Sequence, residues 1–162
     1  DPAYVLKKEL ILIPFFGWFM LKMGMVVVDR EAKASALKKL ITDTKRALAQ
    51  DRKVIIFPEG TRLAPGTSED YHPGIAALYK IPNVSVVPVA LNSGMFWSRR
   101  SLLKRPGVIT MEFLPALPAG LKRPEFLSQL RADIEAATDR LQQEAIEKYG
   151  VPLETIAEPD QP

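Results

Sequence analysis

Four residues whose types could bind a substrate stand together in the first half of the chain: Glu59, Gly60, Thr61 and Arg62. They follow residues 54–57, an apolar and mostly β-branched run that is typical of a buried strand of a parallel sheet. In open α/β sheets, ligands bind at the carboxyl ends of such strands. A guanidinium beside a glycine whose backbone allows close approach suits a phosphate group. The alternative is an ordinary turn from strand to loop with solvated charges.

Periodic patterns of apolar residues predict the elements that hold this turn in place. Short apolar runs predict strands at residues 4–6, 25–28, 54–57, 84–91 and 108–114. Apolar spacings of three and four predict helices at residues 35–50 and 75–80, and a last helix that begins near Pro124 and ends before Gly150. The helix at residues 35–50 has an apolar stripe and a basic face: Leu37, Leu40, Ile41, Thr44 and Leu48, and Lys38, Lys39, Lys45 and Arg46. The last helix has an apolar stripe: Leu127, Leu130, Ile134, Ala137, Leu141 and Ala145. Strands that alternate with helices predict an α/β fold with a mostly parallel central sheet covered by helices.

The composition of the 162 residues is that of a folded domain without disulfide chemistry. Hydrophobic residues make up 47% of the chain, which excludes a disordered class, and the length suits one domain with a substantial core. Cysteine is absent and the sequence has a single histidine, His72, so no metal site is expected. The formal net charge of +3 is compatible with an anionic lipid, an acidic substrate or nucleic acid.

Residues 10–28 form the most apolar part of the chain. Within it, the apolar run at residues 10–21 is too short to cross a membrane, is bounded by charged residues and is broken by Pro14 and Gly17. One interpretation is a pair of short core helices joined at Pro14. The other is a surface that faces a membrane or an acyl chain, with these side chains partly exposed: Phe15, Phe16, Trp18 and Met20. Both can be true together, with one face inward and one toward lipid.

Three segments, in order along the chain, resemble signature blocks of the glycerophospholipid acyltransferase superfamily. Residues 24–30, a glycine and a short apolar strand that lead to an arginine, resemble its second block. Residues 57–62, Phe-Pro-Glu-Gly-Thr-Arg, resemble its third block, and residues 86–90, an apolar strand with a proline, resemble its fourth. Residues 7–18 also resemble the family's sequence before the second block. The resemblance covers most of the chain and implies a glycerol-3-phosphate acyltransferase-like fold.

The resemblance implies a set of substrate-binding residues: Arg30, Glu59, Gly60, Thr61, Arg62 and Pro88. Arg30 and Arg62 each follow a predicted strand, and together they would bind the phosphate monoester of the acceptor. Glu59 and Thr61 would hold glycerol oxygens, and Gly60 would let the backbone come near the substrate. Pro88 would shape the floor of the site beneath the acyl donor.

The same resemblance implies an enzyme of phospholipid biosynthesis. It would transfer a fatty acyl group from acyl-CoA or acyl carrier protein to the free hydroxyl of 1-acyl-sn-glycerol-3-phosphate, giving phosphatidate. No cofactor or metal ion is implied beyond that co-substrate. The family also implies association with a membrane surface, at the cytoplasmic face of the cell membrane. The alternatives are a different lyso-lipid acceptor and a non-catalytic lipid-binding homologue.

The family's first block, His-x-x-x-x-Asp, has no counterpart in the chain. In the family, its histidine is the general base for the acceptor hydroxyl and its aspartate orients that histidine. His72 follows the third block and has Ala77 at the aspartate offset, so it is interpreted as a rim or surface residue. We expect the catalytic block upstream of Asp1. Residues 1–150 are thus expected to be an N-terminally truncated, inactive acyltransferase domain, followed by a polar, flexible tail at residues 151–162.

A basic and apolar cluster follows the fourth block: Trp97, Arg99, Arg100, Leu102, Leu103, Lys104 and Arg105. Interleaved basic and aromatic side chains can bind nucleic acid. No recognised nucleic-acid motif is present, however, so no nucleic-acid partner is expected. The family resemblance favours a loop that touches lipid headgroups or a nucleotide-bearing acyl donor. A solvated loop is the remaining interpretation.

Overall fold

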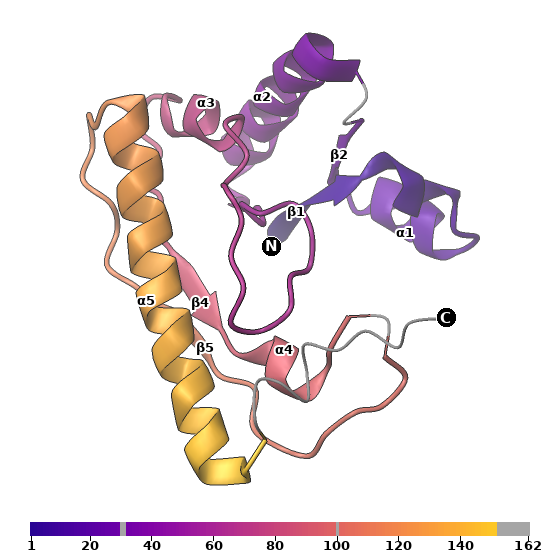
Figure 1. The fold of residues 1–162 in the computed structure, drawn as a ribbon. Helices are drawn as coiled ribbons and strands as arrows, with labels where there is room; N and C mark the ends of the chain where they lie inside the picture. The colour runs from indigo at the N-terminus through magenta and orange to yellow at the C-terminus, as the bar shows by residue number, and fades with distance from the viewer. Residues whose placement is uncertain (30–31, 100, 152–162) are drawn as a thin grey trace. The chain divides into compact units, whose positions relative to one another are not determined.

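The computed structural model describes three ranges of the chain: residues 1–29, 32–99 and 101–151. Internal contacts divide the chain into two compact units. Unit 1 comprises Asp1–Pro58 and Ala77–Pro82, and unit 2 comprises Glu59–Ala76 and Asn83–Pro162. Each unit has a β-sheet of its own (Figure 1).

Unit 1 is built on a parallel three-stranded sheet with the order β2-β1-β3. Its strands are β1 (Pro2–Lys7), β2 (Val26–Val28) and β3 (Lys53–Ile55). β1 pairs with both neighbours, and Val5 lies opposite Val26 while Tyr4 lies opposite Ile55. Helical segments lie in both connections between the strands, as parallel pairing requires. The predicted α/β fold is therefore confirmed.

α2 (Lys33–Ala49) packs against β2 and β3. It buries Leu40 and Ala47 together with the polar residues Asp43 and Thr44, whereas Leu37 of the predicted apolar stripe is exposed. The predicted basic face is exposed: Lys38, Lys39, Lys45 and Arg46. Asp43 forms ion pairs with two of these side chains, and its distance to Arg46 is 3.1 Å. The helix thus turns a partly polar face toward the sheet.

Arg52 is a buried charge in unit 1 to which the sequence analysis assigned no role. Its guanidinium donates to the carbonyl oxygens of Pro2, Met23 and Gly24, at 3.0, 3.0 and 2.9 Å. Its Nε also lies 3.2 Å from a carboxylate oxygen of Asp1, although without the angle of a hydrogen bond. Arg52 therefore joins the segment before β3 to the start of β1 and to the residues that lead into β2.

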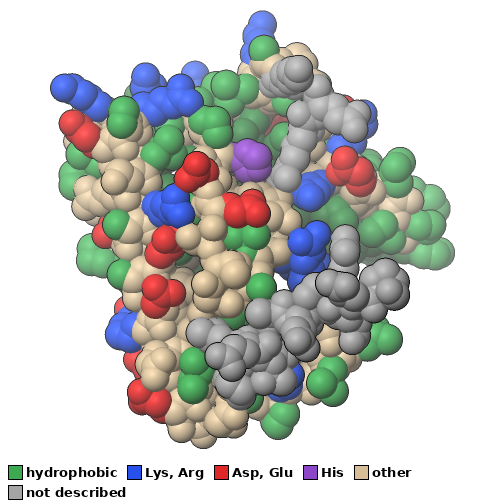
Figure 2. All heavy atoms as spheres, in the orientation of Figure 1, with side chains coloured by type: hydrophobic (Ala, Val, Ile, Leu, Met, Phe, Trp, Pro, Cys, Tyr) green, Lys and Arg blue, Asp and Glu red, His purple; other side chains and the backbone are tan. Residues whose placement is uncertain are grey.

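An exposed apolar surface extends over residues 10–23 of unit 1. η1 (Lys8–Leu12) buries no residue, and α1 (Phe16–Lys22) buries only Gly17. The exposed fraction is 81% for Leu12 and 65% for Trp18. Figure 2 shows hydrophobic side chains gathered where α1 lies in Figure 1. The interpretation as two core helices is therefore wrong, because Phe15, Phe16 and Trp18 are exposed and Met20 is only half-buried.

A tight turn joins η1 to α1. Phe15 has a φ of 62° and a ψ of −53°, and the N–H of Phe16 donates to the carbonyl oxygen of Pro14 at 2.7 Å, as in a strained γ-turn. A β-carbon on Gly17 would lie 1.9 Å from the carbonyl oxygen of Ile11. Gly17 is therefore needed for the close packing of η1 on α1, and it does not interrupt the helix.

Unit 2 is built on an antiparallel pair of strands, β4 (Val89–Leu91) and β5 (Met111–Phe113). α5 (Arg123–Tyr149) runs along this pair (Figure 1) and packs Ala137 and Leu141 against Ala90. α4 (Ser93–Phe96) contributes to a second cluster with the last turns of α5: Met95, Phe96 and Ala145. The stripe predicted for the last helix is buried at Leu130, Ala137, Leu141 and Ala145, with Phe126 and Gln142 buried beside it.

The strands of unit 2 differ from those that the apolar runs predicted. The predicted strand at residues 84–91 is reduced to β4, because Pro88 has no N–H to donate to a ladder. The predicted strand at residues 108–114 is reduced to β5, and its antiparallel pairing was not predicted. In unit 1, residues 54–57 were predicted to be a buried strand. They are half-buried or exposed instead, because β3 lies at an edge of the described sheet.

The chain returns from unit 2 to unit 1 through α3 (Ile75–Tyr79), which is close to the predicted helix at residues 75–80. α5 ends before Gly150, as the sequence predicted. Most of the predicted tail, residues 152–162, lies outside the described residues. The predicted domain boundary at residue 150 stays a prediction.

Candidate functional site

The predicted substrate-binding turn opens unit 2, directly after Pro58. Gly60 adopts a φ of 67°, which L-residues with a side chain rarely take, so glycine is required at the centre of the turn. Glu59 and Thr61 are half-buried beside it, whereas Arg62 is exposed. The turn thus presents a carboxyl group, a hydroxyl group and a solvent-facing guanidinium within four residues.

The remaining residues of the predicted site lie in other places. Arg30 is outside the described residues, so its convergence with Arg62 on one phosphate stays a prediction. Pro88 is buried in unit 2, immediately before β4, and its role beneath the acyl donor also stays a prediction. His72 is exposed, as its interpretation as a rim or surface residue requires.

Glu59 lies in surroundings that raise its pKa. The largest cause is burial, and the charges of Glu135 and Glu69 add to it. Tyr71 shares these surroundings, because burial together with the charges of Glu59 and Glu135 raises the pKa of its hydroxyl. Groups whose pKa is shifted by burial and by specific neighbours cluster at functional sites. The electrostatics therefore favour a site at this turn, independently of the sequence pattern.

Arg131 connects α5 to the loop that follows the turn. Its Nη1 donates to Asp70 Oδ1 at 2.7 Å, and its Nη2 donates to the hydroxyl of Ser68 at 2.8 Å. Its Nε donates to Glu135 Oε1 at 2.7 Å. One guanidinium thus holds the loop and also orients a carboxylate whose charge acts on Glu59.

Three members of this arrangement were not found by sequence reasoning. Arg131 and Glu135 are four residues apart on α5, a spacing that stabilises many surface helices. Nothing in that spacing connects them with Asp70, which lies 61 residues earlier. Tyr71 is 6% exposed, and its hydroxyl has no hydrogen-bond partner among the described residues. No local sequence signal reveals such burial, because the packing of the loop in unit 2 produces it.

We expect Glu59→Gln to stabilise the protein at neutral pH. The fold raises the pKa of Glu59 above its ordinary value of 4.5, so the folded state binds this proton more tightly than the unfolded state. The stability from this proton is complete below the ordinary value and is lost as the pH rises through the raised pKa. Glutamine does not ionise, so the variant avoids the loss. Thermal unfolding between about pH 4 and about pH 8 measures the difference.

Asp139→Asn is the matched control, because Asp139 is exposed on α5. We expect its melting temperature to follow that of the wild-type protein across the pH range. Glu59→Gln should match the wild-type protein at the acidic end and exceed it at the neutral end. Parallel curves for Glu59→Gln and the wild-type protein would show that the carboxyl group is not perturbed.

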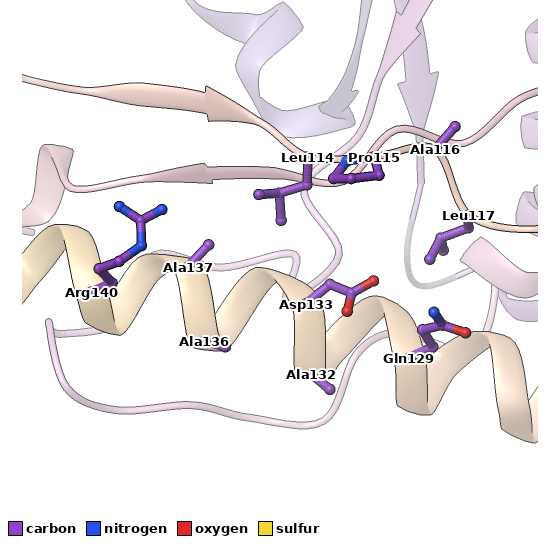
Figure 3. Close-up of a pocket in the computed structure, with 10 residues that line it drawn as sticks. All are labelled: Leu114, Pro115, Ala116, Leu117, Gln129, Ala132, Asp133, Ala136, Ala137 and Arg140. Atoms are coloured by element: carbon purple, nitrogen blue, oxygen red, sulfur yellow. The ribbon is translucent and has the colours of Figure 1, made fainter.

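A groove of about 680 Å³ lies elsewhere in unit 2, between α5 and residues 114–117. Figure 3 shows apolar and small side chains along much of it: Leu114, Leu117, Ala132, Ala136 and Ala137. Arg140 also lines the groove, and it forms ion pairs with Glu112 and, at 3.0 Å, with Glu144. None of the predicted substrate-binding residues lines the groove. The groove is therefore distinct from the turn at Gly60.

The described ranges contain neither a cluster of metal ligands nor a helix that could span a membrane. No three histidine, aspartate or glutamate side chains within residues 1–29, 32–99 and 101–151 are grouped so that they could hold a metal ion. In the same ranges, no helix combines the length and the apolarity that crossing a bilayer requires.

The family model described as Acyltransferase matches residues 1–92, a range that contains the turn at Gly60 and Pro88. The chain therefore belongs to the acyltransferase family. A protein from Pseudomonas aeruginosa named 1-acyl-sn-glycerol-3-phosphate acyltransferase is 35% identical over 134 residues, which cover 83% of this chain and 52% of that protein. A protein of the same name from Streptococcus pneumoniae is 36% identical over 93 residues, which cover 57% of this chain and 33% of that protein.

A solved structure supports the same fold. The crystal structure of the 1-acyl-sn-glycerophosphate acyltransferase PlsC from Thermotoga maritima matches with a TM-score of 0.66 and covers 87% of this chain. The sequence identity is 19%, so the match shows the fold alone. This chain spans about half the length of the P. aeruginosa relative, with 52% of it covered, and 57% of the T. maritima chain. The predicted family and fold class are thereby confirmed.

Proposed function

We propose that the protein is a lysophosphatidate acyltransferase. It transfers a fatty acyl group from acyl-CoA or acyl carrier protein to the free hydroxyl of 1-acyl-sn-glycerol-3-phosphate, and the product is phosphatidate. Membership of the family and the names of its relatives support this reaction class. One structural observation carries the proposal: the left-handed Gly60 sets the half-buried Glu59 and the exposed Arg62 on the same turn.

The proposed reaction needs an acceptor site, a base and a thioester. The acceptor hydroxyl oxygen attacks the thioester carbonyl, an ester C–O bond forms, the C–S bond breaks, and the hydroxyl proton passes to the base. The leaving thiolate stays on CoA or on the carrier protein. Because the thioester is already activated, the proposal needs no cofactor. Residues 1–162 contain no His-x-x-x-x-Asp sequence, so their proposed role is to bind and orient the acceptor.

The turn at Gly60 suits the headgroup of the acceptor for two reasons. The exposed guanidinium of Arg62 can form charge-assisted hydrogen bonds with a phosphate monoester. The raised pKa of Glu59 makes its carboxyl group easier to protonate than an ordinary glutamate, which lessens its repulsion of a nearby phosphate. The carboxyl group of Glu59 can also form a hydrogen bond with a glycerol hydroxyl. The two side chains then act together on one headgroup.

Calorimetric titration with a short-chain lysophosphatidate, below its micelle concentration, tests this proposal. The comparison ligand is lysophosphatidylcholine with the same acyl chain, because its phosphate is a diester with a single negative charge. We expect the phosphate monoester to bind at least about tenfold more tightly. Equal affinities would contradict a phosphate site at the turn. We expect residues 1–162 by themselves to transfer no acyl group from acyl-CoA or from acyl carrier protein, because they contain no His-x-x-x-x-Asp sequence. Transfer from either donor would contradict this expectation and would identify the donor.

We also propose that the protein works at a membrane surface, at the cytoplasmic face of the cell membrane. The exposed apolar surface of residues 10–23 supports a membrane contact. Phe15 and Trp18 form an edge-to-face pair in it, with ring centres 5.5 Å apart, and Lys22 is exposed at the end of α1. Aromatic and lysine side chains of this kind favour the boundary between lipid and water.

A further inference from the structure

Exposed apolar side chains gather on the loop that follows α4 in unit 2. We define the Trp97 loop by five side chains: Trp97, Arg99, Leu102, Leu103 and Lys104. The exposed fraction is 97% for Leu102, 63% for Leu103 and 57% for Trp97. Single exposed apolar residues are common on protein surfaces. Two adjacent leucines and a tryptophan on one loop form a patch of the kind that binds a partner.

Described residues at both ends of the Trp97 loop contact one another. The N–H of Arg105 donates to the carbonyl oxygen of Phe96 at 2.9 Å, which closes the loop at its base. The ammonium group of Lys104 lies 4.1 Å from the centre of the Trp97 ring, which is a cation–π contact. The exposed leucines therefore belong to a folded loop and not to a frayed segment.

The base of the loop is anchored in the core of unit 2. Phe96 is buried in the cluster that joins α4 to α5, and its ring packs edge-to-face on Tyr149 with centres 5.3 Å apart. The packing of unit 2 thus fixes the base of the loop. Leu102 and Leu103 contribute little to that core, because most of their surface is in solvent. Their apolar surface is therefore available to a partner.

The charge near the loop selects an anionic partner. From His72 to Met111 the sequence contains no aspartate or glutamate. Arg99 and Lys104 flank the leucines, and Arg100 lies outside the described residues. Tryptophan prefers the headgroup level of a bilayer, while lysine and arginine reach lipid phosphates and keep their stems in the apolar region. An apolar tip between cations therefore fits an anionic lipid surface better than an uncharged protein groove.

We propose that the Trp97 loop inserts Leu102 and Leu103 into the headgroup region of an anionic bilayer, with Arg99 and Lys104 on lipid phosphates. This contact belongs to unit 2 and is additional to the exposed surface of residues 10–23 in unit 1. The biological role of this contact rests on the proposed function. The contact would bring unit 2 to the membrane that holds the acceptor lipid. Binding of the loop to lipid does not require the turn at Gly60.

Flotation of the chain with vesicles tests the proposal. The vesicles contain equal parts of phosphatidylcholine and phosphatidylglycerol, and the test variant carries Leu102→Glu and Leu103→Glu. Both positions are exposed, so the fold of unit 2 is retained. We expect the vesicle partition coefficient of the variant to fall at least about tenfold, and wild-type binding to weaken as salt is added.

The matched control carries Ala116→Glu and Gln129→Glu, which add the same charge at exposed positions of unit 2 away from the loop. We expect this control to float like the wild-type protein. Equal flotation of the loop variant and the wild-type protein would overturn the proposal, and so would an equal loss in the control. Self-association that depends on Leu102 and Leu103, without vesicle binding, would also overturn it, because a second copy would then be the partner.

A spectroscopic measurement locates the contact in the loop. Trp18 and Trp97 are the two tryptophans of the sequence, so Trp18→Phe leaves Trp97 as the reporter. A blue shift of its fluorescence on adding the same vesicles supports the proposal, and an unchanged spectrum contradicts it. Titration of short-chain lysophosphatidate without vesicles separates this proposal from the proposed function. If the wild-type protein does not bind short-chain lysophosphatidate, the proposed function is refuted. If it binds this ligand but the loop variant floats like the wild-type protein, only the membrane role of the loop is refuted.

Discussion

Replacing Arg52 with methionine is expected to lower the free energy of unfolding by about 3–5 kcal/mol. The buried guanidinium donates to the carbonyl oxygens of Pro2, Met23 and Gly24, and methionine would leave all three without this donor. Methionine fills part of the volume, so the expected loss comes mainly from the hydrogen bonds. Urea unfolding followed by circular dichroism measures the free energy. Amide hydrogen exchange should show the loss of protection in β1 and β2.

Arg46→Met is the matched control for this prediction. Arg46 lies on α2 in the same unit and pairs with Asp43 at 3.1 Å, but its side chain is exposed. Exposed ion pairs contribute at most about 1 kcal/mol, so this variant should unfold close to the wild-type midpoint. If Arg52→Met loses no more stability than Arg46→Met, the three carbonyl contacts are not important for the fold.

Arg62→Ala is expected to weaken the binding of a short-chain lysophosphatidate by about 10- to 100-fold, which corresponds to one charge-assisted contact with its phosphate. The side chain is exposed, so its removal should not unfold unit 2. Arg62→Lys keeps the charge but loses the planar guanidinium group. Its affinity should lie between those of the wild-type protein and Arg62→Ala. Calorimetric titration measures all three proteins, and a parallel melting curve verifies that each is folded.

Arg123→Ala removes an equivalent charge at an exposed position in unit 2, at the start of α5. If the loss of affinity in Arg62→Ala comes from a local contact at the turn, Arg123→Ala should bind lysophosphatidate like the wild-type protein. An equal loss in Arg62→Ala and Arg123→Ala would mean that only the net charge matters. Unchanged binding in Arg62→Ala would remove this residue from the acceptor site.

Much of the fold was predictable because it depends on local patterns. The three strands of unit 1, α2, α3 and the limits of α5 lie close to the predicted ranges. The positive φ of Gly60 also follows from local chemistry, since the turn needs a residue without a side chain at that point. Predictions were less accurate where pairing decides the structure. β4 and β5 are shorter than their apolar runs, and they pair antiparallel.

The interpretation of residues 10–23 shows why an apolar pattern does not determine burial. The same run suits a pair of core helices or an exposed surface, because both need large apolar side chains at helical spacing. Only the folded chain shows that Leu12 and Trp18 face solvent. For the same reason, Leu102 and Leu103 were noticed in the sequence, but their exposure on a loop closed at Phe96 was not.

By itself, the sequence determined the family, the α/β class and the turn from Glu59 to Arg62, because strand ends, glycine requirements and signature spacing are properties of neighbouring residues. Tertiary structure alone decided the surroundings of that turn. Arg131 contacts Asp70, and the charge of Glu135 acts on Glu59, only when α5 packs beside the loop that follows the turn. Arg52 likewise meets its carbonyl partners only in the assembled sheet. Burial and charge act through space, so no local pattern could have revealed these contacts or the raised pKa of Glu59.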